Sequence, residues 1–242
     1  MTPILALEKI SKRFGAIIVA SDIDLTVPRG QALGIIGPNG AGKTTLFGMI
    51  AGAVTPDAGR IIFDDADITR LAAPQRCRRG IARSFQIPQP FGHMSVFENL
   101  LVAARLGAGL GKSEADHTSI EILERCGLAD LANRPANSLT LLQRKRLELG
   151  RALASKPKLL LLDEVAGGLT EVECNALVEL IRAVKDTGVT IVWIEHIVNA
   201  LIAVVDRLVV LHGGALIADG DPQRVIKSPE VEEIYMGIPA HA

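Results

Sequence analysis

The chain begins with two stretches in which apolar and polar residues alternate. The first runs from Ile4 to Ile10. The second, from Ile17 to Val27, is interpreted as strand, turn and strand, and a Pro-Arg-Gly turn at 28–30 follows it. Alternation over short stretches separated by turns is typical of β-strands with one buried face. We therefore expect an antiparallel β layer at the start of the chain.

Three later stretches are continuously apolar instead. They are Ala32–Ile36, Leu159–Leu162 and Val189–Ile194, and each is short enough to be a strand buried on both faces. A helical pattern at 171–186 separates the second from the third, and a further strand is expected at 207–211. Strands that alternate with helices predict a parallel sheet, with ligands bound where its strands end.

The middle of the chain, about residues 88–154, has little β character. Prolines and a glycine at 88–92 interrupt regular structure, and Ser95 followed by Glu98 indicates the start of a helix. Helical patterns then continue to about residue 154. We expect a helical subdomain over about 88–154, inserted into the α/β core.

The strand at 32–36 leads into a glycine-rich turn whose sequence matches a phosphate-binding P-loop, G-x-x-x-x-G-K-T. Strand, turn and helix start follow in the order this motif requires, which disfavours a chance glycine-rich turn. Lys43 would bridge the β- and γ-phosphates of a nucleotide, and the Thr44 hydroxyl would ligate Mg²⁺. The phosphate-binding residues are Gly37, Pro38, Asn39, Gly40, Ala41, Gly42, Lys43, Thr44 and Thr45.

Two carboxylates, Asp163 and Glu164, directly follow the leucine-only strand at 159–162. The ends of parallel strands meet at one edge of a sheet, so these residues should lie near the P-loop. Asp163 would hold Mg²⁺, and Glu164 would act as the general base for the attacking water. A strand that ends in acidic residues by chance is the competing interpretation.

Gln86 and His196 complete the set of candidate residues. A single glutamine in a proline-rich loop is usually solvated, and a single histidine after a strand is usually structural. Gln86 lies between the P-loop and Asp163, and His196 follows the strand at 189–194. Together they fit a pair of γ-phosphate sensors, one on each side of the nucleotide.

Composition narrows the choice of function. The 242 residues are 48% apolar and can bury the core of one large α/β domain, while a net charge of −1 gives no electrostatic reason to expect nucleic acid. The three cysteines lack metal-ligand spacing and indicate a reduced, cytosolic protein. Acidic charge at the N-terminus disfavours a signal peptide, and no apolar run reaches the roughly 18 residues of a membrane span. Any work at a membrane should therefore need a partner.

In their order along the chain, these motifs resemble the ATP-binding subunits of ABC transporters. The resemblance covers essentially the whole chain, and its nearest form is the branched-chain (hydrophobic) amino-acid uptake group. The phrases ARSFQIPQPFGHMSVFENLLVAA, LLLLDEVAGGLTE and VWIEHIVNAL carry that closer likeness. The resemblance implies a single ABC ATP-binding domain over 1–242. Its fold would be an α/β P-loop NTPase (RecA-like) core with an N-terminal antiparallel β layer and an inserted helical subdomain.

The resemblance also implies roles for particular residues. Phe14 would stack on adenine, Gln86 would contact Mg²⁺ and the attacking water, and His196 would contact the γ-phosphate and hold Glu164. The segment Ile87–Phe97 would form part of a groove for transmembrane permease subunits. A second ATP-binding subunit, identical or different, would complete each ATP site with its own copy of the segment 139–143.

That segment departs from the family pattern L-S-G-G-Q. Here it is Leu139, Thr140, Leu141, Leu142 and Gln143, so both glycines are leucine. Backbone N–H groups could still face a phosphate only if the leucine side chains point elsewhere. A tolerated variant, a weakened site and pairing with a different subunit are all open. Thr170, where many members have aspartate, leaves a further contact across the dimer in doubt.

We therefore expect an ATPase subunit of an importer for branched-chain or other hydrophobic amino acids, or similar small organic solutes. It would be cytoplasmic and peripheral on the inner face of the membrane, bound through its partners. The alternatives are a non-transport ABC-type ATPase acting on nucleic acid or ribosomes, a P-loop kinase, and an exporter or lipid-extraction ATPase. A non-transport ABC-type ATPase would usually carry paired ATPase domains. A P-loop kinase would need a lid over its phosphate acceptor, which is not evident in this sequence.

Overall fold

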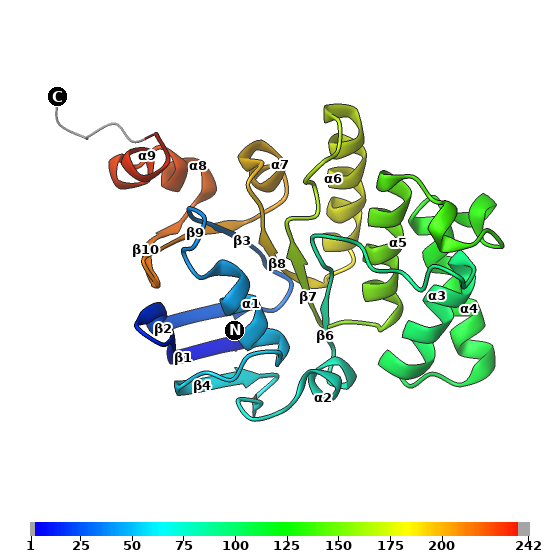
Figure 1. The fold of residues 1–242 in the computed structure, drawn as a ribbon, viewed down its shortest axis with the longest axis horizontal. Coiled ribbons are helices and arrows are strands. Elements are labelled where there is room, and N and C mark those ends of the chain that lie inside the picture. The colour runs from blue at the N-terminus through cyan, green and yellow to red at the C-terminus, as the bar shows by residue number, and fades with distance from the viewer. Residues whose placement is uncertain (1–2, 237–242) are drawn as a thin grey trace.

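The computed structural model describes residues 3–236, in which two sheets and a group of helices lie side by side (Figure 1). The first sheet is antiparallel, with the strand order β2-β1-β4-β5, and confirms the predicted N-terminal layer. The segment 17–28 is one continuous strand rather than two, because Asp22 absorbs the irregularity with a φ of 46°. The strands are β1 (Pro3–Phe14), β2 (Ile17–Pro28), β4 (Ala58–Phe63) and β5 (Ala66–Asp67).

The second sheet has the strand order β10-β9-β3-β8-β7-β6 and forms the centre of the molecule (Figure 1). Its strands β6, β7, β8, β3 and β9 are parallel, as the continuously apolar runs predict, and β10 pairs antiparallel with β9. The strands are β3 (Ala32–Ile36), β6 (Ile81–Arg83), β7 (Leu159–Asp163), β8 (Thr190–Ile194), β9 (Arg207–His212) and β10 (Ala215–Gly220).

Alternate residues of β3 belong to two separate parts of the core. Leu33 and Ile35 pack with α1 and the first sheet, whereas Ala32 and Ile36 pack with α5, α6 and α7. The central sheet is therefore covered on both faces, which explains why its strands are apolar throughout. The longer helices are α1 (Lys43–Ala51), α4 (Lys112–Arg125), α5 (Leu141–Ala154), α6 (Glu171–Lys185) and α9 (Pro229–Met236), and the shorter ones are α2 (Ala73–Arg78), α3 (Val96–Val102), α7 (Val198–Ile202) and α8 (Pro222–Ile226).

The helices α3, α4 and α5 stand together beyond β6, with a π-helical turn at Ala103–Gly107 after α3 (Figure 1). Ser95 caps α3 as predicted, since its hydroxyl accepts from the Glu98 N–H at 3.1 Å and the Glu98 carboxylate accepts from the Ser95 N–H at 2.7 Å. The limits of the subdomain, 88 and 154, stay a prediction. Among residues 3–236, no helix is both long and apolar enough to cross a membrane.

Pairing within the central sheet brings the chemically interesting segments together. Ile194 at the end of β8 lies level with Ile35 in β3 and with Asp163 in β7. The P-loop, the Asp163-Glu164 pair and the Glu195-His196 pair therefore leave the sheet at one edge.

Arg76 in α2 is a buried cation that holds the end of the P-loop helix. Its guanidinium donates to the carbonyls of Met49 and Ile50 at 2.5 and 2.9 Å, and to those of Thr69 and Leu71 at 2.9 and 2.8 Å. The carbonyls in the last turn of a helix have no partner within the helix, so Arg76 supplies one.

Replacing Arg76 with methionine is expected to lower the free energy of unfolding by about 3 kcal/mol, because buried carbonyls would lose a charged donor. Urea denaturation measures the change. The neighbouring Arg79 is exposed, and Arg79→Met is the matched control, expected to change stability by less than about 0.5 kcal/mol. Equal stability of the two variants would contradict a structural role for Arg76.

Candidate active site

The phosphate loop joins the buried strand β3 to the first turn of α1. Gly42 precedes α1 with a φ of 102°, and a Cβ at this position would lie 2.1 Å from the Val19 carbonyl oxygen. Only glycine satisfies both conditions. No side chain caps α1, so its first N–H groups and its positive end are left for an anion, as the motif predicts.

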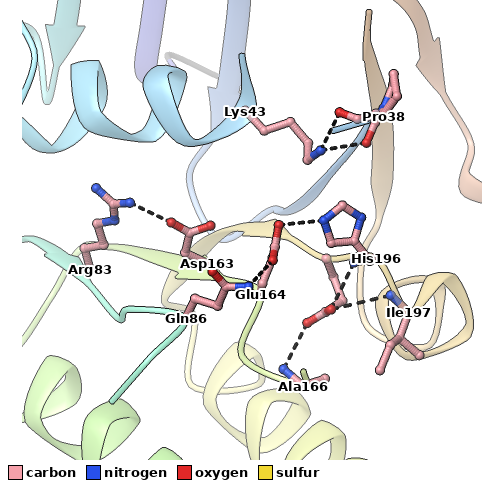
Figure 2. Close-up of polar contacts among 11 residues, drawn as sticks. Pro38, Lys43, Arg83, Gln86, Asp163, Glu164, Ala166, His196 and Ile197 are labelled. Carbon is pink, nitrogen blue, oxygen red and sulfur yellow. Dashed lines mark hydrogen bonds and ion pairs between the residues drawn. The ribbon is translucent and has the colours of Figure 1, made fainter. Parts of the chain in front are cut away.

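Lys43 is buried at the start of α1, and its ammonium group lies across the loop (Figure 2). Its Nζ donates to the carbonyl oxygens of Gly37 at 2.6 Å and of Pro38 at 3.0 Å. Burial lowers the pKa of Lys43, and the charges of Glu164 and Asp163 oppose that shift. The cation therefore lies between the loop and the acidic strand end.

Asp163 ends β7, and one of its oxygens is bound by an arginine that sequence analysis did not single out. Arg83 Nη2, from the end of β6, donates to Asp163 Oδ2 at 2.6 Å (Figure 2). The Arg83 guanidinium lies 6.0 Å from the ring centre of Phe47 in α1 and 5.2 Å from that of Phe85. Arg83 thus joins the metal-ligand candidate to α1 and to the loop that carries Gln86.

The donor set suits Mg²⁺. Asp163, the Thr44 hydroxyl and the Gln86 side-chain carbonyl offer hard oxygen atoms, which Mg²⁺ prefers in combination with phosphate oxygens and water. No group of three or more His, Cys, Asp and Glu within residues 3–236 could hold a metal by itself.

Glu164 is bound from both sides by the two predicted sensor residues (Figure 2). Its Oε2 accepts from Gln86 Nε2 at 2.5 Å, and its Oε1 lies 2.6 Å from His196 Nε2. Glu164 has a φ of 48°, a left-handed conformation that costs a residue with a side chain about 1–3 kcal/mol and is concentrated at functional sites. The three residues predicted as catalytic are therefore brought into one cluster.

Glu195 is a buried carboxylate beside this cluster, and its part in the site was not predicted. It is 2% exposed. Its Oε2 accepts from the Ala166 N–H at 3.0 Å, and its Oε1 accepts from the N–H groups of His196 at 2.9 Å and Ile197 at 3.4 Å. An acidic residue directly after an apolar strand was the available signal, but no motif gave it a role.

Phe14 ends β1 and is 51% exposed, and Lys12 Nζ lies 5.2 Å from its ring centre. Ile17 and Ile18, across the hairpin, are also exposed. An exposed apolar patch of this kind suits a planar base. The stacking of Phe14 on adenine stays a prediction.

The two leucines that replace the family's glycines, Leu141 and Leu142, are accommodated in different ways. Leu142 packs against the core, while Leu141 is 38% exposed and its Cδ2 lies 3.4 Å from the place a Cβ on Gly168 would take. Thr140 caps α5 by accepting from the Gln143 N–H at 3.4 Å. Leu142 therefore has its side chain against the core, and the contact of this segment with a second subunit stays a prediction.

A groove of about 470 Å³ runs between α2, β6, the end of α3 and α5. Phe85 and Leu106, both largely exposed, line it together with Arg151. Of the segment Ile87–Phe97, only Phe91 reaches the groove. That Ile87–Phe97 forms part of a groove for permease subunits stays a prediction, and the other walls of this hollow come from elements far apart in sequence.

A P-loop that precedes a helix, with carboxylates and a polar cluster at the same sheet edge, defines a P-loop nucleoside triphosphatase. The family model described as ABC transporter matches residues 20–167, more than half of the chain. The chain belongs to the ABC transporter family, and it is an ATP-hydrolysing subunit.

Three comparisons show how far the likeness extends. The high-affinity branched-chain amino acid transport ATP-binding protein BraF of Pseudomonas aeruginosa is 36% identical over 97% of this chain and 98% of its own. The lipopolysaccharide export system ATP-binding protein LptB of Escherichia coli is 34% identical over 96% and 97%. The crystal structure of the ADP conformation of MJ1267, an ATP-binding cassette of an ABC transporter, has a TM-score of 0.88 at 32% identity, over 98% of this chain and 100% of that one.

Proposed function

We propose that this protein powers an importer of branched-chain or other hydrophobic amino acids, or of similar small organic solutes. The similarity to BraF carries the proposal, together with the likeness of LivG of Escherichia coli, a branched-chain amino acid transport ATP-binding protein that is 35% identical over 97% of this chain. LptB is nearly as similar, so an exporter that extracts lipid is the second candidate.

The cluster at the sheet edge suits hydrolysis of a bound triphosphate. Lys43 and the N–H groups of α1 bind the phosphates, and Thr44, Asp163 and Gln86 would hold Mg²⁺, which neutralises charge on the phosphate oxygens. Glu164 accepts a proton from a water molecule while the oxygen of that water attacks the γ-phosphorus. The bond between the γ-phosphorus and the oxygen that bridges to the β-phosphate breaks. His196 and Gln86 fix the direction of the Glu164 carboxylate through the contacts at 2.6 and 2.5 Å.

Coupling to transport requires partners. Two ATP-binding subunits would face each other so that the segment Leu139–Gln143 of one completes the ATP site of the other. The groove lined by Phe85, Phe91 and Leu106 would receive a segment of a transmembrane permease subunit. These contacts would place the protein on the inner face of the membrane, and no part for nucleic acid is expected.

Deletion of the gene is expected to reduce uptake of labelled leucine by cells, and re-expression should restore it. A copy carrying Glu164→Gln should not restore uptake, because the subunit would bind ATP without turnover. Uptake of labelled lysine is the control and should not change. Normal leucine, isoleucine and valine uptake after deletion, with loss of lipopolysaccharide from the cell surface, would contradict the importer and favour the exporter.

A further inference from the structure

Glu195 lies where the loops that carry the catalytic candidates meet. The loop after β8 contains His196, whose N–H binds Glu195 Oε1. The turn after β7 contains Glu164 and Ala166, and the Ala166 N–H binds Glu195 Oε2. One carboxylate therefore joins the two loops whose side chains meet 2.6 Å apart, at Glu164 Oε1 and His196 Nε2 (Figure 2).

A third loop, the one that holds Gln86, is bound by Lys145 of α5. The Lys145 side chain is 6% exposed, and its Nζ donates to the Gln86 carbonyl oxygen at 3.3 Å. Burial lowers the pKa of Lys145, and the charge of Glu195 opposes that shift. The negative charge of Glu195 thus favours a cation that binds the backbone of the loop holding Gln86.

We infer that Glu195 is a positioning residue for ATP hydrolysis, which fixes the loops of Glu164 and His196. Within residues 3–236, the hydrogen bonds of the Glu195 side chain go to the backbone at 166, 196 and 197, and none goes to the phosphate loop. It should therefore act on the chemical step and not on nucleotide affinity. The inference rests on the roles of Glu164 and His196 proposed above.

Glutamine is the appropriate replacement because it keeps the shape of the side chain. A carboxylate accepts on both oxygens, whereas an amide accepts on one and would place its NH₂ group against either the Ala166 or the His196 N–H. One of the two loops should then shift. A misplacement of about 1 Å in an active site can lower the rate by about 100-fold.

The test compares wild type, Glu195→Gln, His196→Ala and the double variant. ATPase assays give kcat and KM, equilibrium titration gives MgATP affinity, and urea denaturation gives stability. Glu195→Gln is expected to lower kcat by about 10- to 100-fold and to leave MgATP affinity within about twofold of wild type. If Glu195 acts through His196, the double variant should be no slower than His196→Ala by more than about threefold.

Unchanged kcat in Glu195→Gln would overturn the inference. A Glu195→Gln protein that loses kcat and MgATP affinity equally, in step with a loss of folded protein, would also overturn it. That result would indicate a structural role alone. If Glu195→Gln does not fold, Glu195→Asp keeps the charge near Lys145 but shortens the reach to Ala166, and the same comparison applies. Full ATPase activity in Glu164→Gln would instead refute the proposed catalytic base, which distinguishes the two failures.

Discussion

Replacing Lys43 with alanine is expected to lower MgATP affinity by about 10- to 100-fold, because a phosphate would lose a charge-assisted hydrogen bond. Lys43 Nζ bonds only to the Gly37 and Pro38 carbonyls within residues 3–236, so no carboxylate must release it before a phosphate binds. The N–H groups of α1 would remain and should retain weak binding. Equilibrium titration with MgATP measures the affinity.

Lys112 at the start of α4 provides the matched control for Lys43. It is exposed and lies in a helix outside the central sheet, so Lys112→Ala should keep wild-type MgATP affinity. Urea denaturation of both variants separates a loss of binding from a loss of folding. Unchanged affinity in well-folded Lys43→Ala protein would refute the phosphate cradle.

Much of the site could be predicted because its residues are next to strands that the apolar pattern reveals. The runs at 32–36, 159–162 and 189–194 became β3, β7 and β8 with small changes at their ends. Parallel strands end at one edge, so the order of motifs along the chain was enough to bring Lys43, Glu164 and His196 together. The strand order was not predicted, because it depends on pairing between segments that lie far apart in the sequence.

Residues whose role depends on contacts formed only in the folded chain were not predicted. Arg83 and Glu195 belong to no spacing rule, and their importance appears only once β6, β7 and β8 are paired. Ile87–Phe97 was predicted to form part of a groove for a permease, and its Phe91 lines a hollow whose other walls, between α2 and α5, leave no local pattern in sequence. Leu142 packs inward and Leu141 lies beside Gly168, and whether this segment completes an ATP site in a second subunit stays a prediction.

Replacing Glu164 with glutamine is expected to lower kcat by about 100- to 10,000-fold and to leave MgATP binding intact. The amide cannot take a proton from water, although its oxygen can still accept from Gln86 or His196. Lys43 and the phosphate loop are unchanged, so the nucleotide should remain bound. Single-turnover measurement of phosphate release gives the rate. Glu179→Gln, on the exposed face of α6, is the control and should hydrolyse ATP at the wild-type rate.

A near-wild-type rate in Glu164→Gln would exclude Glu164 as the general base. The slow variant also tests whether two copies of this chain close around ATP, because the triphosphate would persist long enough to hold the dimer. Light scattering with and without MgATP gives the mass. ATP-dependent dimers would mean that Leu139–Gln143 completes a site across the dimer although Leu141 and Leu142 stand in place of glycines. A monomer that binds ATP would point to a different ATP-binding subunit as the partner, or to closure that needs the membrane subunits.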